Sequence, residues 1–70
     1  KLNTVSGEIT DIMTSVNDGN TVYYLQINGK YYYIAVTDCM DVLLMKKGDT
    51  VTVTFDKDAD TFVKAKSIKK

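Results

Sequence analysis

The stretch NTVYYLQINGKYYYIAVTD, from Asn20 to Asp38, holds all five tyrosines of the chain and decides how it folds. Two alternating runs of apolar and polar residues flank the pair Asn28-Gly29. This pattern is the strongest short-range signal for a β-hairpin with a type I′ two-residue turn. The turn type fixes the register of the two strands, because it places Tyr24 opposite Tyr33 and Gln26 opposite Tyr31.

Side chains alternate across a strand, so this register sorts the hairpin residues onto two faces. We expect one face to point into the core, and its residues are Tyr23, Leu25, Ile27, Tyr32, Ile34 and Val36. The other face carries three of the tyrosines and is expected to lie on the outside; its residues are Val22, Tyr24, Gln26, Tyr31, Tyr33 and Ala35.

The segment Val5–Val16 predicts a long first strand. Its apolar residues alternate as far as Ile9 and fall out of step at Ile12. A β-bulge near Thr10–Asp11 restores the alternation and lets a long strand bend around a barrel. The segment Asn17–Asn20 contains a glycine and is predicted to be a turn.

The stretch DCMDVLLMKKG, from Asp38 to Gly48, predicts one short helix of about two to three turns. Asp38 suits the N-cap position and Gly48 suits the residue after the helix. The helical residues expected to face the core are Met40, Leu43, Leu44 and Met45. Two further strands follow, at DTVTVTFD with valines inward and threonines outward, and at TFVKAKSI.

The predicted order is three strands, a short helix and two strands, all in one domain spanning residues 1–70. A five-stranded β-barrel with a helix between its third and fourth strands is the plan of the OB-fold. An SH3-like barrel is the main alternative, but it lacks a helix at this position. The chain begins with Lys1 rather than methionine, so a processed product and a piece of a longer protein both remain open.

The second half of the chain resembles the closing part of TOBE and molybdopterin-binding (Mop) domains. The matching residues are Thr37, Val42, Leu44, Met45, Lys46, Gly48, Asp49, Val51 and Val53. The opening of the chain is similar to theirs through Asn3, Gly7, Ile9 and Ile12. The resemblance implies an OB-like barrel and a small-oxyanion ligand. The chain departs from it at Leu2, where those domains carry arginine, and at DKDAD, where they carry their oxyanion segment.

The composition argues against an enzyme. The chain has no histidine and one cysteine, Cys39, so it offers neither a Cys–His or Ser–His pair nor an internal disulfide. We expect no catalytic residues, no cofactor and no metal site. No apolar run approaches the roughly 18 residues that a membrane span needs, so we expect no membrane span. The sequence indicates no cellular compartment.

The acidic run Asp56–Asp60 resembles the start of an EF-hand calcium loop. That motif then requires a glycine and a bidentate glutamate, where this chain has Thr61 and Ser67. We therefore interpret the run as a solvated hairpin loop.

The outward tyrosine face is the candidate ligand surface, because OB-folds bind oligonucleotides and oligosaccharides on this part of the barrel. Exposed aromatic rings offer a stacking face to bases, a nearby amide can form hydrogen bonds, and lysines can touch phosphates. The candidate residues are Tyr24, Tyr31, Tyr33, Gln26, Lys64 and Lys66.

Three functions remain open at this point. The first is a module that binds single-stranded nucleic acid, although a net charge of zero and the lack of arginine count against it. The second is a protein-interaction or oligomerisation domain that buries the tyrosine face against a partner. The third is a TOBE-like oxyanion module that works as a homo-oligomer. Cross-strand packing is a purely structural explanation for the tyrosines, as shielding of a strand edge is for the lysines.

Overall fold

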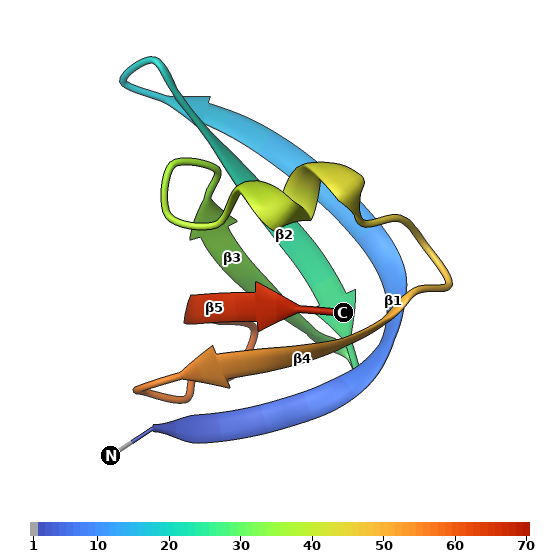
Figure 1. Cartoon of the computed structure of the whole chain (residues 1–70). Helices are drawn as coiled ribbons and strands as arrows, with labels where there is room; N and C mark the ends of the chain where they lie inside the picture. Colours follow the sequence, from blue (N-terminus) through green and yellow to red (C-terminus); the bar gives the residue numbers. More distant parts are fainter. Residues whose placement is uncertain (1) are drawn as a thin grey trace.

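The structure is a computed structural model that describes residues 2–70. Five strands form a closed β-barrel with one short 3₁₀ helix (Figure 1). The elements, in chain order, are β1 (Asn3–Asn17), β2 (Asn20–Ile27), β3 (Lys30–Ala35), η1 (Met40–Leu44), β4 (Thr50–Phe55) and β5 (Phe62–Lys69).

The strand order around the barrel is β1-β2-β3-β5-β4, and β4 closes the ring by pairing with β1. Among the neighbouring strands of residues 2–70, β3 and β5 run parallel and the other pairs are antiparallel. A parallel pair needs a long crossover connection, which η1 and β4 supply here. The predicted OB-type barrel is confirmed.

The hairpin that decides the fold has the predicted turn and register. Asn28 and Gly29 both have positive φ, 54° and 84°, as a type I′ turn requires. Tyr24 pairs with Tyr33 and Gln26 pairs with Tyr31. The turn at 17–20 has the same form, and it lets β1 and β2 extend as a hairpin beyond the other strands (Figure 1).

The bulge predicted in β1 lies between Ile9 and Asp11, where the register shifts. Residues before it, Asn3–Glu8, pair with β4, whereas those from Ile9 onward pair with β2. At the bend Gly7 lies so close to β2 that an added Cβ atom would stand 2.7 Å from Cγ2 of Ile27. Glycine therefore permits the close approach of the two strands.

The core fills the barrel from every strand, because each contributes its inward alternate residues. Its buried members are Ile9, Leu25, Ile27, Tyr32, Ile34, Val42, Met45, Val51, Val53, Phe55, Val63, Ala65 and Ile68. All the buried hairpin residues belong to the face predicted to point inward, and its remaining members, Tyr23 and Val36, pack partly buried against this core.

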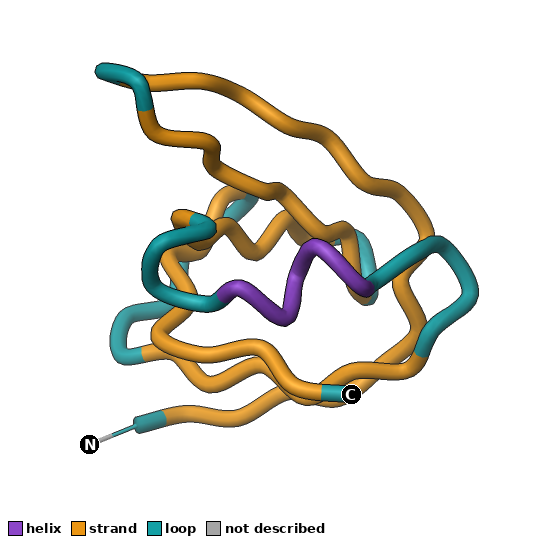
Figure 2. The backbone as a smooth tube through the Cα atoms, turned by 45° about the horizontal axis from the view of Figure 1, so that its top comes forward, coloured by secondary structure: helices purple, strands orange, loops and turns teal. Residues whose placement is uncertain are grey.

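The predicted helix is wrong in length and in its buried face. It is a 3₁₀ segment of five residues, and Asp38 does not cap it, since Cys39 holds the N-cap position without a side-chain hydrogen bond. Val42 and Met45, three residues apart, enter the core, as suits the three-residue turn of a 3₁₀ helix. Three residues expected to be buried, Met40, Leu43 and Leu44, are exposed. In Figure 2, η1 crosses in front of the ring of strands.

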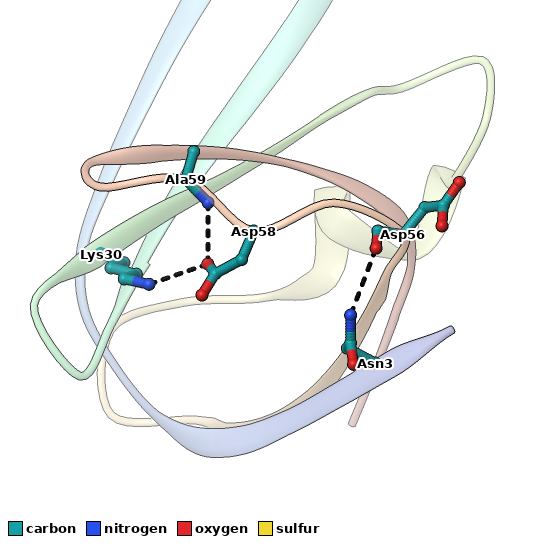
Figure 3. Close-up of polar contacts among 5 residues, drawn as sticks. All are labelled: Asn3, Lys30, Asp56, Asp58 and Ala59. Atoms are coloured by element: carbon teal, nitrogen blue, oxygen red, sulfur yellow. Dashed lines mark hydrogen bonds and ion pairs between the residues drawn. The ribbon is translucent and has the colours of Figure 1, made fainter. Parts of the chain in front are cut away.

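The loop between β4 and β5 is held at its start and at its middle by side chains from other strands (Figure 3). Lys30 forms an ion pair of 2.8 Å with Asp58, whose carboxylate also accepts the N–H of Ala59. Asn3 donates a hydrogen bond to the carbonyl oxygen of Asp56. The hydrogen bond from Lys30 keeps the pKa of Asp58 below its ordinary value. The acidic loop is thus anchored to β3 through the carboxylate of Asp58 and to β1 through the carbonyl oxygen of Asp56.

Among residues 2–70, no helical segment has the length and apolar character that a membrane crossing requires.

Candidate ligand surface on the barrel

The strand registers align the outward residues of β1, β2, β3 and β5 in two rows that run across the sheet. Residues paired across neighbouring strands lie on the same face. The first row consists of Asp11, Gln26, Tyr31 and Phe62. The second row consists of Met13, Tyr24, Tyr33 and Lys64. Three of the tyrosines and one phenylalanine therefore lie on one outer face; we call Tyr24, Tyr31, Tyr33 and Phe62 the aromatic surface.

The four rings contact one another in a chain. Tyr33 and Tyr24 are tilted neighbours with ring centroids 5.5 Å apart, and Tyr24 meets Phe62 edge to face at 5.9 Å. Phe62 in turn stacks on Tyr31, with centroids 5.7 Å apart and planes 23° apart. Such pairs stabilise one another beyond the area they bury. The rings support each other and form a pre-arranged platform.

A groove opens over this platform. Its volume is about 480 Å³, which lies within the usual range for ligand sites. Phe62 is 49% exposed, and the three tyrosines are only partly buried. The lining residues are Met13, Thr14, Ser15, Tyr24, Tyr33 and Phe62. The groove therefore combines apolar and aromatic residues with Thr14 and Ser15 of β1.

Tyr31 is held by a polar contact at the far end of its row. Its hydroxyl donates a hydrogen bond of 2.9 Å to Oδ2 of Asp11, and Lys47 lies 3.6 Å from Oδ1 of the same carboxylate. The hydrogen bond from Tyr31 lowers the pKa of Asp11, and the same bond raises the pKa of the Tyr31 hydroxyl. The ring of Tyr31 is thus fixed, while its hydroxyl is already occupied.

Gln26 is placed on the outer face as predicted, but its amide is also engaged. The hydroxyl of Thr10, the residue at the bulge, lies 2.9 Å from Oε1 of Gln26. This contact uses one lone pair of the amide oxygen and leaves its NH₂ group as a donor. Gln26 therefore offers a ligand fewer hydrogen bonds than the sequence suggested.

The lysines of β5 border the aromatic surface. Lys64 pairs in register with Tyr33, and Lys66 follows two residues later on the same exposed face. Within residues 2–70 neither lysine has an ion-pair partner. A cleft of about 240 Å³ connects them with Lys57 and Asp56 of the β4–β5 loop. Cationic groups thus lie along one side of the rings.

Phe62 is the surface residue that sequence reasoning missed. The alternation of TFVKAKSI, with Val63 and Ala65 inward, already placed Phe62 on the outer face beside Lys64. Its position among the tyrosines depends on the parallel pairing of Tyr31 with Phe62, which no local pattern indicates. An explicit OB strand order would have supplied that pairing.

The described part of the chain, residues 2–70, contains no group of three or more Cys, Asp or Glu side chains that could hold a metal ion. The thiol of Cys39 is half-buried and donates to the carbonyl oxygen of Ile68 at 3.3 Å.

Taken together, the aromatic surface and the lysines beside it offer a ligand three kinds of contact, namely stacking on the rings, hydrogen bonding and contact with a cation.

Comparisons with known proteins add no relative: the chain matches no protein-family model, and neither the curated proteins nor the solved structures gave a significant match.

Proposed function

We propose that this domain is a non-catalytic binding module that holds single-stranded nucleic acid on its aromatic surface. The observation that carries the proposal is the row in which Tyr24, Tyr33 and Lys64 lie side by side. Single strands are bound by rings that stack on bases beside cations that follow the phosphates. Both kinds of contact occur here on adjacent strands.

The charge distribution suits this ligand better than the net charge of zero suggests. Asp11 is the acidic group within the two rows, and Lys47 and the Tyr31 hydroxyl both contact its carboxylate. In the acidic loop after β4, Asp58 is engaged by Lys30. Lys64, which pairs in register with Tyr33, and Lys66 form no ion pair within residues 2–70, and Lys57 adds a third cation to the cleft that they share with Asp56. Local charge, not the sum over the chain, governs contact with a phosphate backbone.

A labelled oligothymidylate tests the proposal, because thymine stacks and the strand has little structure of its own. We expect its fluorescence anisotropy to rise on titration with the domain at low salt. Phe62→Ala removes an exposed ring that lies outside the core, and we expect it to weaken binding by about fivefold to 150-fold, which corresponds to about 1–3 kcal/mol for one stacked base.

Leu44→Ala is the matched control, since Leu44 is a 74% exposed apolar residue of η1, outside both rows. It should bind as the wild type does. An absence of binding by the wild type at low salt contradicts the proposal, as does equal binding by Phe62→Ala.

A protein partner on the same groove is the second candidate. Met13 and Phe62 favour it, because they are exposed apolar residues at the groove with no polar group to recognise a base. If a protein partner occupies the groove, the oligonucleotide fails to bind, and Phe62→Ala instead weakens binding of that partner.

A further inference from the structure

The upper part of β1, from Ile12 to Val16, has one strand edge that no other strand covers within residues 2–70. Its pairing with β4 ends at Glu8, and the β4 entry loop bonds to β1 only at Ile9. Beyond that point β1 has β2 on one side only (Figure 1). We call this open side the free edge of β1.

The hydrogen-bond pattern shows which residues face outward there. The N–H of Val36 donates a hydrogen bond to the carbonyl oxygen of Thr21. Thr21 and each second residue of β2 after it therefore direct their backbone N–H and C=O groups toward β3. The residues of β2 between them direct their backbone N–H and C=O groups toward β1. Their partners in β1 include Met13 and Ser15. Consequently Ile12, Thr14 and Val16 direct their backbone N–H and C=O groups to the free edge.

Soluble proteins usually protect such an edge with lysine, proline or a covering segment. The sequence IMTSV at Ile12–Val16 contains neither a charge nor a proline. Val16 is 69% exposed and Met13 is 40% exposed. The free edge is thus a template for another extended strand, the arrangement known as β-augmentation.

We propose that the free edge of β1 pairs with the free edge of a second copy of this chain to form a symmetric dimer. Antiparallel pairing centred on Thr14 is the register that uses all three outward residues of both copies. It places Thr14 opposite Thr14 and Ile12 opposite Val16 of the second copy, so β-branched side chains meet, as favourable cross-strand pairs require. A two-fold axis through this point makes the interface self-complementary and closed.

The charges agree with this register. Asp11 lies opposite Asn17 of the second copy, and Thr10 lies opposite Asp18. No charged side chain of the pairing segment faces a like charge, which would destabilise it. An unrelated peptide would have to supply this complementarity, whereas the second copy contains it.

The dimer joins the two aromatic surfaces. Met13 of β1 lies at the end of the row of Tyr24, Tyr33 and Lys64. Pairing through β1 continues the sheet from β3 of one copy to β3 of the other, and the outer faces lie on the same side. The expectation that one long single strand of nucleic acid binds across both surfaces rests on the proposed function. The pairing itself does not, and it is tested without nucleic acid.

Sedimentation equilibrium of the 70-residue chain tests the dimer. We expect the wild type to reach twice the chain mass of 7.8 kDa as its concentration rises. Thr14→Lys places two lysines opposite each other on the two-fold axis and should sediment as a monomer. Thr4→Lys is the matched control, because Thr4 is an exposed threonine of the same strand within the part paired with β4. It should remain dimeric.

A disulfide provides a second readout if Thr14→Lys fails to fold. Two residues that form a hydrogen-bonded pair across antiparallel strands, as the two Thr14 residues would here, have Cα atoms about 5.5 Å apart, within the range that a disulfide spans. In a Cys39→Ser background, Thr14→Cys should oxidise to a covalent dimer, and Thr4→Cys should not. A wild type that stays monomeric at all concentrations overturns the proposal. So does a dimer that Thr14→Lys leaves intact or that Thr14→Cys does not cross-link.

Discussion

The Tyr31 hydroxyl and the Asp11 carboxylate join β3 to β1 across the width of β2, through a hydrogen bond of 2.9 Å. Both residues belong to the row that ends at Phe62, so the bond fixes the ring on which Phe62 stacks. It also links the two ionisable groups, since it lowers the pKa of Asp11 and raises that of Tyr31. The contribution of this bond to stability therefore depends on the protonation of both groups.

Removal of this bond should change the pH dependence of stability at both extremes. The folded pKa of Asp11 lies below its ordinary value of 3.8, so its contribution is present above that value and disappears as the pH falls through the folded pKa. The folded pKa of Tyr31 lies above 10.0, so its contribution is present below that value and disappears as the pH rises through the folded pKa.

We expect Tyr31→Phe to lower the free energy of unfolding at neutral pH. The variant should also lose less stability than the wild type as the pH falls below 3.8 or rises above 10.0. Urea unfolding across the pH range measures the effect. Tyr24→Phe is the control, because it removes a hydroxyl from the same face without touching the bond to Asp11. Identical pH profiles for the two variants would refute this role of the bond.

Met40, the first residue of η1, and Met45, the residue that follows it at the C-cap, provide a matched test of how this segment is buried. Met45 is 7% exposed and belongs to the core, whereas Met40 is 68% exposed. We expect Met45→Ala to reduce the free energy of unfolding by about 2–5 kcal/mol, through lost contacts and a cavity. Met40→Ala should change it by less than about 0.5 kcal/mol. Chemical denaturation distinguishes the two, and equal losses would indicate that η1 packs through another face.

Gly7 tests the close approach of β1 and β2. A Cβ atom at this position would lie 2.7 Å from Cγ2 of the fully buried Ile27, which has no room to move. We expect Gly7→Ala to destabilise the fold by about 1–3 kcal/mol, as overpacking of a core does. The unfolding midpoint in urea is the measurement. Thr4→Ala, at an exposed site of β1, serves as reference; a Gly7→Ala variant as stable as this reference would contradict the geometry.

Lys64 tests the phosphate contact beside the rings. If Lys64 neutralises one phosphate of a single strand, Lys64→Gln should lower the slope of log K against log salt concentration by about 0.7. Lys69→Gln is the control, because Lys69 lies on the same strand but pairs with Thr52 of β4, about 16 Å along the strand from Lys64. Titrations at several salt concentrations give both slopes. An unchanged slope for Lys64→Gln removes this lysine from the interface.

Local signals explain why much of the fold could be predicted from the sequence. Asn28 and Gly29 determine the turn, the turn determines the register, and the register determines which tyrosines face outward. The bulge near Thr10 was predictable for a similar reason, because the apolar alternation of β1 breaks there. These features depend on residues that lie close together in the chain.

The errors arose where distant contacts decide the outcome. Met40, Leu43 and Leu44 have helical spacing, but they are exposed, and Val42 and Met45 are the residues of this segment that are buried in the core. Phe62 joins the tyrosines through a parallel pairing between strands separated by η1 and β4. The hydrogen bond from Thr10 to Gln26 likewise depends on the bulge geometry rather than on residue type.

Chemical-shift mapping by nuclear magnetic resonance tests the proposed ligand surface most directly. Oligothymidylate added to the isotopically labelled chain at low salt should shift the signals of Met13, Tyr24, Tyr33, Phe62 and Lys64. The signals of Leu43 and Leu44 in η1 should stay in place. Shifts confined to η1, or none at all at saturating oligonucleotide, would contradict the account.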